Sequence, residues 1–125
     1  PHNCYFCTAP MMTDRRFRLR EVEDVVAEIR SNIERYGLNR VYFWDDNFFI
    51  NTKRTKRLLR AMIEAFPDVK FECPSGAEAN ALDEEVIELL AKAGFTRLQL
   101  PIEAATEEVQ QSNVDKKVKL DRIPE

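Results

Sequence analysis

The sequence predicts an α/β fold in which parallel strands are covered by helices. Short apolar runs rich in β-branched and aromatic residues alternate with longer segments whose apolar residues recur at helical spacing. Capping residues, proline and glycine mark the boundaries between them. Strand–helix–strand connections in one sheet are right-handed and make the strands parallel. With 125 residues, the chain has the length of one domain.

The composition excludes several classes of protein. The chain has 19 basic and 22 acidic residues, a formal net charge of −3, which argues against a general nucleic-acid binder. No stretch approaches the roughly 18 apolar residues that a membrane span needs. Three cysteines are too few for a disulfide scaffold. We therefore expect a cytoplasmic protein that binds neither membranes nor nucleic acids.

A long amphipathic helix is predicted from Glu21 onward. Its apolar residues lie on one face because they recur three or four residues apart: Val22, Val25, Val26, Ile29, Ile33 and Tyr36. Gly37 follows as the expected C-terminal cap. Residues 1–18 contain Pro10 and other helix-breaking residues and are predicted to be irregular.

Two strands and a second helix follow. Residues 40–44 read Arg-Val-Tyr-Phe-Trp and predict a buried strand. Residues 53–66 are predicted to form a helix that ends at Pro67. Its apolar face consists of Leu58, Leu59, Met62, Ile63 and Phe66. Residues 69–73 form the second predicted strand and stop at Pro74.

The last part of the chain repeats the alternation. Asp83 is the expected N-cap of a third helix that ends at Gly94. The inward face of this helix is predicted to consist of Val86, Ile87, Leu90 and Ala93. Residues 96–102 form a third strand, and Thr106 is the expected cap of a short fourth helix. The charged tail, residues 113–125, predicts no element.

Polar side chains follow the first and third strands, at the sheet edge where reactive groups collect in such folds. Asp45, Asp46 and Asn47 could hold a cation, bind an amino group, or form a polar turn. The preceding aromatic run would partly dehydrate the carboxylates, and this favours a binding role. Glu103 ends an apolar strand, so either it has a ligand or positive partner, or it lies exposed at the rim.

The sharpest local signal is a pair of cysteines separated by two residues, Cys4 and Cys7. A turn between them would present both sulfurs to one metal ion or cluster iron. The pair is incomplete, because zinc takes four ligands and a cubane cluster at least three. A thioredoxin-like redox role is the competing interpretation, but it needs a strand directly before the pair. Cys73 is predicted to be a small core residue.

Several segments, taken in order, resemble one known family. They are Cys4-Tyr5-Phe6-Cys7, Phe43-Trp44-Asp45-Asp46-Asn47-Phe48, Ser75-Gly76-Ala77-Glu78-Ala79, Leu82-Asp83, Ala93-Gly94-Phe95 and Pro101-Ile102-Glu103-Ala104-Ala105. Together they resemble the radical SAM superfamily, and within it the group that often carries an upstream cobalamin-binding domain. This resemblance covers almost the whole chain.

The resemblance implies a partial (β/α) barrel of parallel strands and covering helices, with about three and a half βα units. The family signature spaces three cysteines as C-x-x-x-C-x-x-C, and the first of them would fall one position before Pro1. We therefore expect residues 1–125 to be a truncated radical SAM core domain. The first strand and the units after the fourth helix would be missing, and the chain alone would be inactive.

The resemblance also implies two cofactors. Cys4 and Cys7, with the upstream cysteine, would ligate three irons of a [4Fe-4S] cluster. The fourth iron would bind the amino and carboxylate groups of S-adenosylmethionine (SAM), which is cleaved reductively to a 5′-deoxyadenosyl radical. Cobalamin is expected in the full-length protein if the upstream domain is present.

The family's remaining cofactor contacts fall on residues already singled out. Phe6 would lie against the adenine, and Asp45, Asp46 or Asn47 would bind the amino group of SAM. Glu103 would contact the ribose hydroxyls.

The unpaired edges of a partial sheet are expected to drive formation of a homodimer. A small zinc-binding or redox module built on the cysteine pair is the alternative function.

Overall fold

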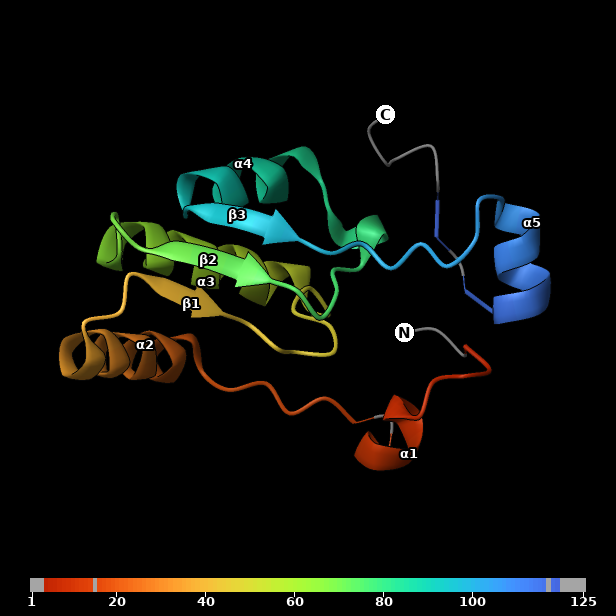
Figure 1. The fold of residues 1–125 in the computed structure, drawn as a ribbon, viewed down its shortest axis with the longest axis horizontal. Coiled ribbons are helices and arrows are strands. Elements are labelled where there is room, and N and C mark those ends of the chain that lie inside the picture. The colour runs from red at the N-terminus through yellow and green to blue at the C-terminus, as the bar shows by residue number, and fades with distance from the viewer. Residues whose placement is uncertain (1–3, 15, 117, 120–125) are drawn as a thin grey trace.

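The computed structural model describes residues 4–14, 16–116 and 118–119, and it contains one sheet with helices packed against it (Figure 1). The strands are β1 (Arg40–Tyr42), β2 (Lys70–Cys73) and β3 (Phe95–Leu98). The helices are α1 (Ala9–Thr13), α2 (Val22–Tyr36), α3 (Thr52–Ala65), α4 (Glu84–Lys92) and α5 (Glu107–Val109), with a 3₁₀ turn at Ala79–Ala81 and a π turn at Gln110–Val114. Within this described part of the chain, no helix has the length and apolar character needed to cross a membrane.

The sheet has the order β1-β2-β3, and both strand pairs are parallel. Val41 pairs with Phe71, and Phe71 pairs with Phe95. The register shifts between Phe71 and Glu72, because Glu72 pairs with Arg97 and leaves Thr96 as an extra residue. The predicted α/β fold with parallel strands and covering helices is confirmed. All three carboxyl ends therefore lie at one edge of the sheet, on the side where Figure 1 shows α1 and α5.

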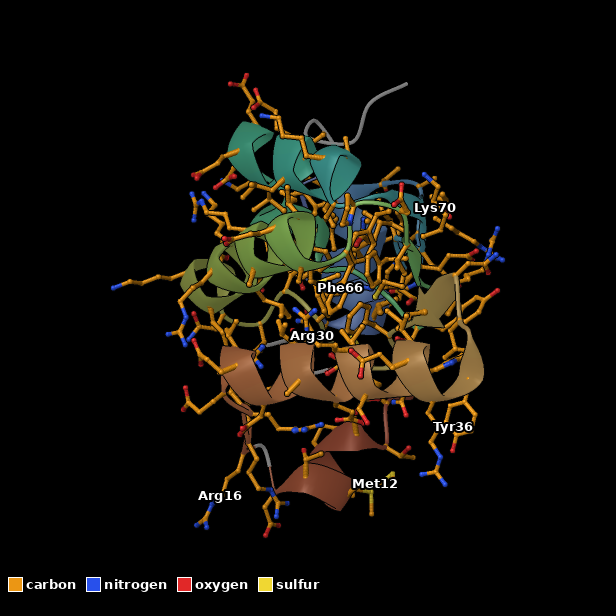
Figure 2. The ribbon with its side chains drawn as sticks, turned by 90° about the vertical axis from the view of Figure 1, so that its left-hand side faces the viewer. Met12, Arg16, Arg30, Tyr36, Phe66 and Lys70 are labelled. Atoms are coloured by element: carbon orange, nitrogen blue, oxygen red, sulfur yellow. The ribbon has the colours of Figure 1, made fainter. Side chains whose placement is uncertain are left out.

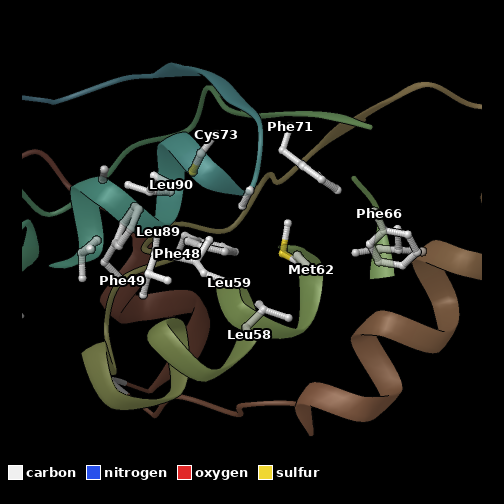
Figure 3. Close-up of a cluster of buried hydrophobic side chains, with 14 of the residues drawn as sticks. Phe48, Phe49, Leu58, Leu59, Met62, Phe66, Phe71, Cys73, Leu89 and Leu90 are labelled. Carbon is white, nitrogen blue, oxygen red and sulfur yellow. The ribbon is translucent and has the colours of Figure 1, made fainter. Parts of the chain in front are cut away.

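The hydrophobic core lies between the sheet and helices α2, α3 and α4. In Figure 1, α3 lies behind the strands, with α2 below and α4 above. Figure 3 shows the side chains that fill this space, and Leu59, Met62 and Phe71 among them are fully buried. The guanidinium of Arg30 on α2 lies 5.5 Å from the centre of the Phe66 ring, a contact that links α2 to the end of α3. Figure 2 labels both residues.

Helix boundaries follow the capping residues in the sequence. Gly37 ends α2 with φ at +65°, in the left-handed region that favours glycine, and its N–H donates to the carbonyl of Ile33 at 2.8 Å. Asn51 caps α3 by accepting from the N–H of Arg54 at 3.0 Å. The predicted N-cap Asp83 accepts from the N–H of Val86 at 2.8 Å. At these three helix ends, local chemistry therefore fixes where the helix begins or ends.

The prediction of a buried strand at residues 40–44 is wrong in its burial. The strand exists, but β1 is an edge strand of the described sheet, and Arg40 and Tyr42 are exposed. Trp44 lies beyond the strand and is 73% exposed. An apolar run predicts a strand well, but it does not show whether a second strand covers its outer side.

Three smaller differences concern local structure. Residues 9–13 form the short helix α1, because Pro10 lies in the first turn, where it costs no hydrogen bond. The third strand ends at Leu98 and not at residue 102. On α4, Val86 and Leu90 are buried as predicted, but Leu89 is buried in place of Ile87, which is half exposed. The prediction for Thr106 is confirmed, since its hydroxyl accepts from the N–H of Val109 at 3.3 Å.

An ion-pair cluster joins α3 to the start of α4. The Lys56 ammonium lies 2.7 Å from a carboxylate oxygen of Asp83 and 2.7 Å from one of Glu85. Its hydrogen bonds hold the pKa values of both carboxyl groups below their ordinary range. In return, the carboxylates raise the pKa of Lys56, chiefly through the hydrogen bond with Asp83.

We expect Lys56→Met to lower the free energy of unfolding at neutral pH and to have little effect in strong acid. A carboxyl group with a lowered folded-state pKa contributes stability above its unfolded pKa, and this is lost as the pH falls through the folded value. Denaturant unfolding across a pH series measures the difference from wild type. Lys92→Met removes a more exposed pair with Glu88 and is the control. A difference that does not change with pH would contradict this interpretation.

Candidate functional site

One cavity of about 1140 Å³ lies at the carboxyl ends of the strands. Its wall contains all seven residues singled out in the sequence: Cys4, Phe6, Cys7, Asp45, Asp46, Asn47 and Glu103. They come from three separate places, namely the loop before α1, the loop after β1 and the segment after β3. The parallel strands explain why these three segments lie close together, because the carboxyl ends of parallel strands share one edge of the sheet.

The two cysteines lie on a tight turn. The N–H of Cys7 donates to the carbonyl of Cys4 at 3.0 Å, which brings the ends of the four-residue segment together. Cys4 is half-buried, Cys7 is exposed, and neither forms a disulfide. Burial raises the pKa of the Cys4 thiol, and the nearby ammonium of Lys116 opposes that rise. The turn therefore presents two free thiols to one cavity.

Phe6 lies between the two cysteines and also lines the cavity. Its side chain is 64% exposed although it is large and apolar. An exposed aromatic ring at a cavity wall can stack against a planar group such as a purine.

The loop after β1 carries the two carboxylates. Asp45 and Asp46 are exposed, so the predicted partial dehydration by a buried aromatic run is wrong. Asn47 is half-buried, and its side-chain oxygen accepts from the N–H of Phe49 at 3.1 Å. Asn47 therefore shapes the turn that leads toward α3. Within the described ranges, no hydrogen bond or ion pair engages the side-chain carboxylates of Asp45 and Asp46, which line the cavity.

A serine links this loop to its neighbour. The hydroxyl of Ser75, which follows β2, lies 2.6 Å from the carbonyl of Asp45 and 3.4 Å from that of Phe43. The loop after β2 is itself tied to the chain beyond β3, since the N–H of Ala77 donates to the carbonyl of Gln99 at 2.7 Å. All three loops at this edge are therefore connected. Ser75 stood at a strand end in the sequence, but nothing there indicated its partner.

Glu103 has a positive partner that the sequence did not identify. Its carboxylate lies 3.3 Å from the ammonium of Lys116, a residue that is only 6% exposed. The same ammonium donates to the carbonyl of Pro101. Glu103 therefore has the positive partner that was one of the two expectations. Its side chain is 31% exposed and lines the cavity. Lys116 lies in the tail that predicted no element, so no local pattern pointed to it.

The donor set fits part of an iron–sulfur site. Two thiols on one turn have the chemistry and placement of cluster ligands. Among the described residues, no group of three or more histidine, cysteine or acidic side chains could hold a metal ion. Two thiols are one fewer than the three thiolates that a cubane cluster needs.

Comparison with protein families and with curated proteins shows what this chain is similar to. The family model of the Radical SAM superfamily matches residues 1–123. A cytidylyl-2-hydroxyethylphosphonate methyltransferase of Streptomyces wedmorensis is 28% identical over 120 residues, which are 96% of this chain and 22% of the relative.

Two further relatives are also named as methylating enzymes. A hopanoid C-2 methylase of Rhodopseudomonas palustris is 33% identical over 82% of this chain and 20% of its own length. A bacteriochlorophyllide d C-12(1)-methyltransferase of Chlorobaculum tepidum is 30% identical over 90% of this chain and 24% of its own length. The chain thus spans about a fifth to a quarter of the curated relatives that it matches.

Proposed function

Because the chain belongs to the radical SAM superfamily, we propose that it forms the cofactor-binding part of a longer radical SAM enzyme, the parent protein. The observation that carries this proposal is the meeting of the cysteine turn, an exposed aromatic ring and three carboxylates on one cavity. A cationic amino group, a purine and ribose hydroxyls are the groups that such a set recognises. SAM contains all three.

Cys4 and Cys7 would hold a [4Fe-4S] cluster through their thiolates, together with a cysteine of the parent protein. When bound, the cluster supplies the electron that cleaves SAM and releases the 5′-deoxyadenosyl radical. The ammonium of Lys116 favours the thiolate form of Cys4 electrostatically, because it lowers the pKa that burial raises. The two cysteines alone would not hold the cluster firmly, so we expect the isolated chain to be inactive.

The remaining wall of the cavity would orient SAM. Asp45 and Asp46 would accept hydrogen bonds from the amino group, which is cationic when free. Asn47 would support them by shaping the turn, since its own oxygen is engaged by the N–H of Phe49. Phe6 would cover the adenine, and Glu103 would accept from the ribose hydroxyls.

Methyl transfer is the reaction class we propose for the parent protein. Its support is that the curated relatives are named as methylating enzymes, although their acceptors differ from one another. Cobalamin bound by an upstream domain is the methyl carrier that the sequence resemblance leads us to propose. The acceptor molecule would contact parts of the parent protein beyond this chain.

The location and partners follow from the same sequence features. We propose a cytoplasmic enzyme that binds small-molecule cofactors and neither membranes nor nucleic acid, in keeping with its slight acidic excess.

The exposed edges of β1 and β3 would allow the isolated chain to form a homodimer. Size-exclusion chromatography over a range of concentrations tests the dimer, and a strict monomer would count against it.

The proposed activity is tested by cleavage of SAM. The parent protein is purified without oxygen, reconstituted with iron and sulfide, reduced and mixed with SAM. We expect 5′-deoxyadenosine by chromatography, and none when the reductant is omitted. The alternative, a small zinc or redox module, predicts a colourless protein that binds zinc through Cys4 and Cys7. That result would overturn the radical mechanism.

A further inference from the structure

We propose that Lys116 is a positioning residue that fixes the carboxylate of Glu103 for its contact with the ribose of SAM. The inference rests on the proposed function and extends it to a residue in the tail of the chain. Glu103 would be the residue that touches SAM. Lys116, which lines the same cavity beside Glu103, would act through the Glu103 carboxylate.

Burial is the first observation. The side chain of Lys116 is 7% exposed, and a lysine buried to this extent needs partners for its charge. Its ammonium has two: the carbonyl of Pro101 and a carboxylate oxygen of Glu103 at 3.3 Å. The Glu103 side chain is 31% exposed by comparison. One side of it therefore contacts the lysine, and the other side faces the cavity.

The backbone at Glu103 gives the second observation. Glu103 has φ at +73°, in the left-handed region that residues other than glycine rarely adopt. The strand ends five residues earlier, so no ladder of hydrogen bonds holds this turn. Contacts from another segment must stabilise it, and the ammonium of Lys116 contacts both sides of the turn, at Pro101 and at Glu103.

The third observation is how the chain brings Lys116 back to this point. The π turn Gln110–Val114 ends at Asp115, which has φ at +54°, and the N–H of Lys116 then donates to the carbonyl of Gln110 at 3.0 Å. Gln110 is fully buried, and its side-chain amide donates to the carbonyl of Ala104 at 3.2 Å. Gln110 thus forms hydrogen bonds with both ends of the segment from residue 104 to Lys116. These bonds keep the ammonium of Lys116 beside Glu103.

A structural lysine and a positioning lysine make different predictions for ligand binding. If Lys116 only supports the fold, its loss weakens the binding of every cavity ligand to the same extent. If it positions Glu103, the loss is confined to ligands that carry ribose hydroxyls. An analogue of SAM that lacks the 2′ and 3′ hydroxyls separates the two cases.

The experiment measures dissociation constants in the reconstituted parent protein by isothermal titration calorimetry. We expect Lys116→Met to weaken the binding of SAM by about tenfold or more, the effect of losing one charge-assisted interaction. The affinity for the 2′,3′-dideoxy analogue should stay within about threefold of wild type. Lys116→Arg should retain most of the affinity for SAM. Lys119→Met, an exposed lysine of the same tail, is the matched control.

A second variant covers the case in which Lys116→Met does not fold. Lys116→Gln keeps a donor for the Pro101 carbonyl but removes the charge, and it should show the same ribose-selective loss. Equal losses for SAM and the analogue, or wild-type affinity for both, would overturn the role of Lys116 and leave the proposed function intact. Failure of the wild-type protein to bind SAM would overturn both.

Discussion

Replacing Cys4 or Cys7 with alanine is expected to abolish iron–sulfur cluster binding by the parent protein. Each variant would leave two thiolates where a cubane cluster needs three. Iron content and the thiolate-to-iron absorbance should fall to background, and 5′-deoxyadenosine formation with them.

The third cysteine of the chain provides the matched control. Cys73 is fully buried and is not one of the residues that line the cavity, although its sulfur lies 3.7 Å from the carbonyl of Gly76, which does line it. Cys73→Ala should therefore retain the cluster, although it removes some core packing. Full iron content in both the Cys4 and the Cys7 variants would show that the cluster, if any, is bound elsewhere.

Phe71→Ala is expected to lower the free energy of unfolding by about 3–5 kcal/mol, the usual cost of deleting a buried phenylalanine. Phe71 is fully buried at the centre of the sheet, with ring-centre distances of 6.1 Å to Phe43 and 5.7 Å to Phe95. The helices behind it would have to move to fill the space left by the ring. Denaturant unfolding measures the loss.

An exposed phenylalanine is the control for this experiment. Phe17 is 51% exposed, so Phe17→Ala should change the free energy of unfolding by no more than about 0.5 kcal/mol. A loss below about 1 kcal/mol for Phe71→Ala would contradict the placement of this ring at the centre of the core.

Much of the fold could be predicted because its signals are local. The apolar spacing from Val22 and the glycine at position 37 define α2 within one residue at each end. Asp83 marks the start of α4 through a hydrogen bond that its own side chain makes three residues away. Such interactions depend only on neighbours in sequence, so a single sequence contains them.

Features that depend on distant segments could not be predicted. The aromatic run at residues 42–44 indicates a strand, but its exposure follows from the place of β1 at an edge of the sheet. The burial of Lys116 depends on a π turn and on carbonyl groups about 12 to 15 residues away. Nothing in its neighbourhood of Asp115 and Lys117 distinguishes it from a solvated lysine.

The candidate site lies between these two cases. The spacing of Cys4 and Cys7 and the rule that reactive groups follow parallel strands were enough to select residues that do line one cavity. They did not reveal the Ser75 link between loops or the partner of Glu103, because both are contacts between segments far apart in sequence. Motif and topology predict where a site lies, and packing decides how its members are held.

The most direct test of the proposed site is the electron paramagnetic resonance spectrum of the reduced parent protein, recorded with and without SAM. If the cavity places SAM against a cluster held by Cys4 and Cys7, adding SAM should change the spectrum of the reduced cluster. Glu103→Gln should shift that change to higher SAM concentrations. A cluster spectrum that saturating SAM leaves unchanged, or a protein that forms no cluster at all, would contradict the assignment of this cavity.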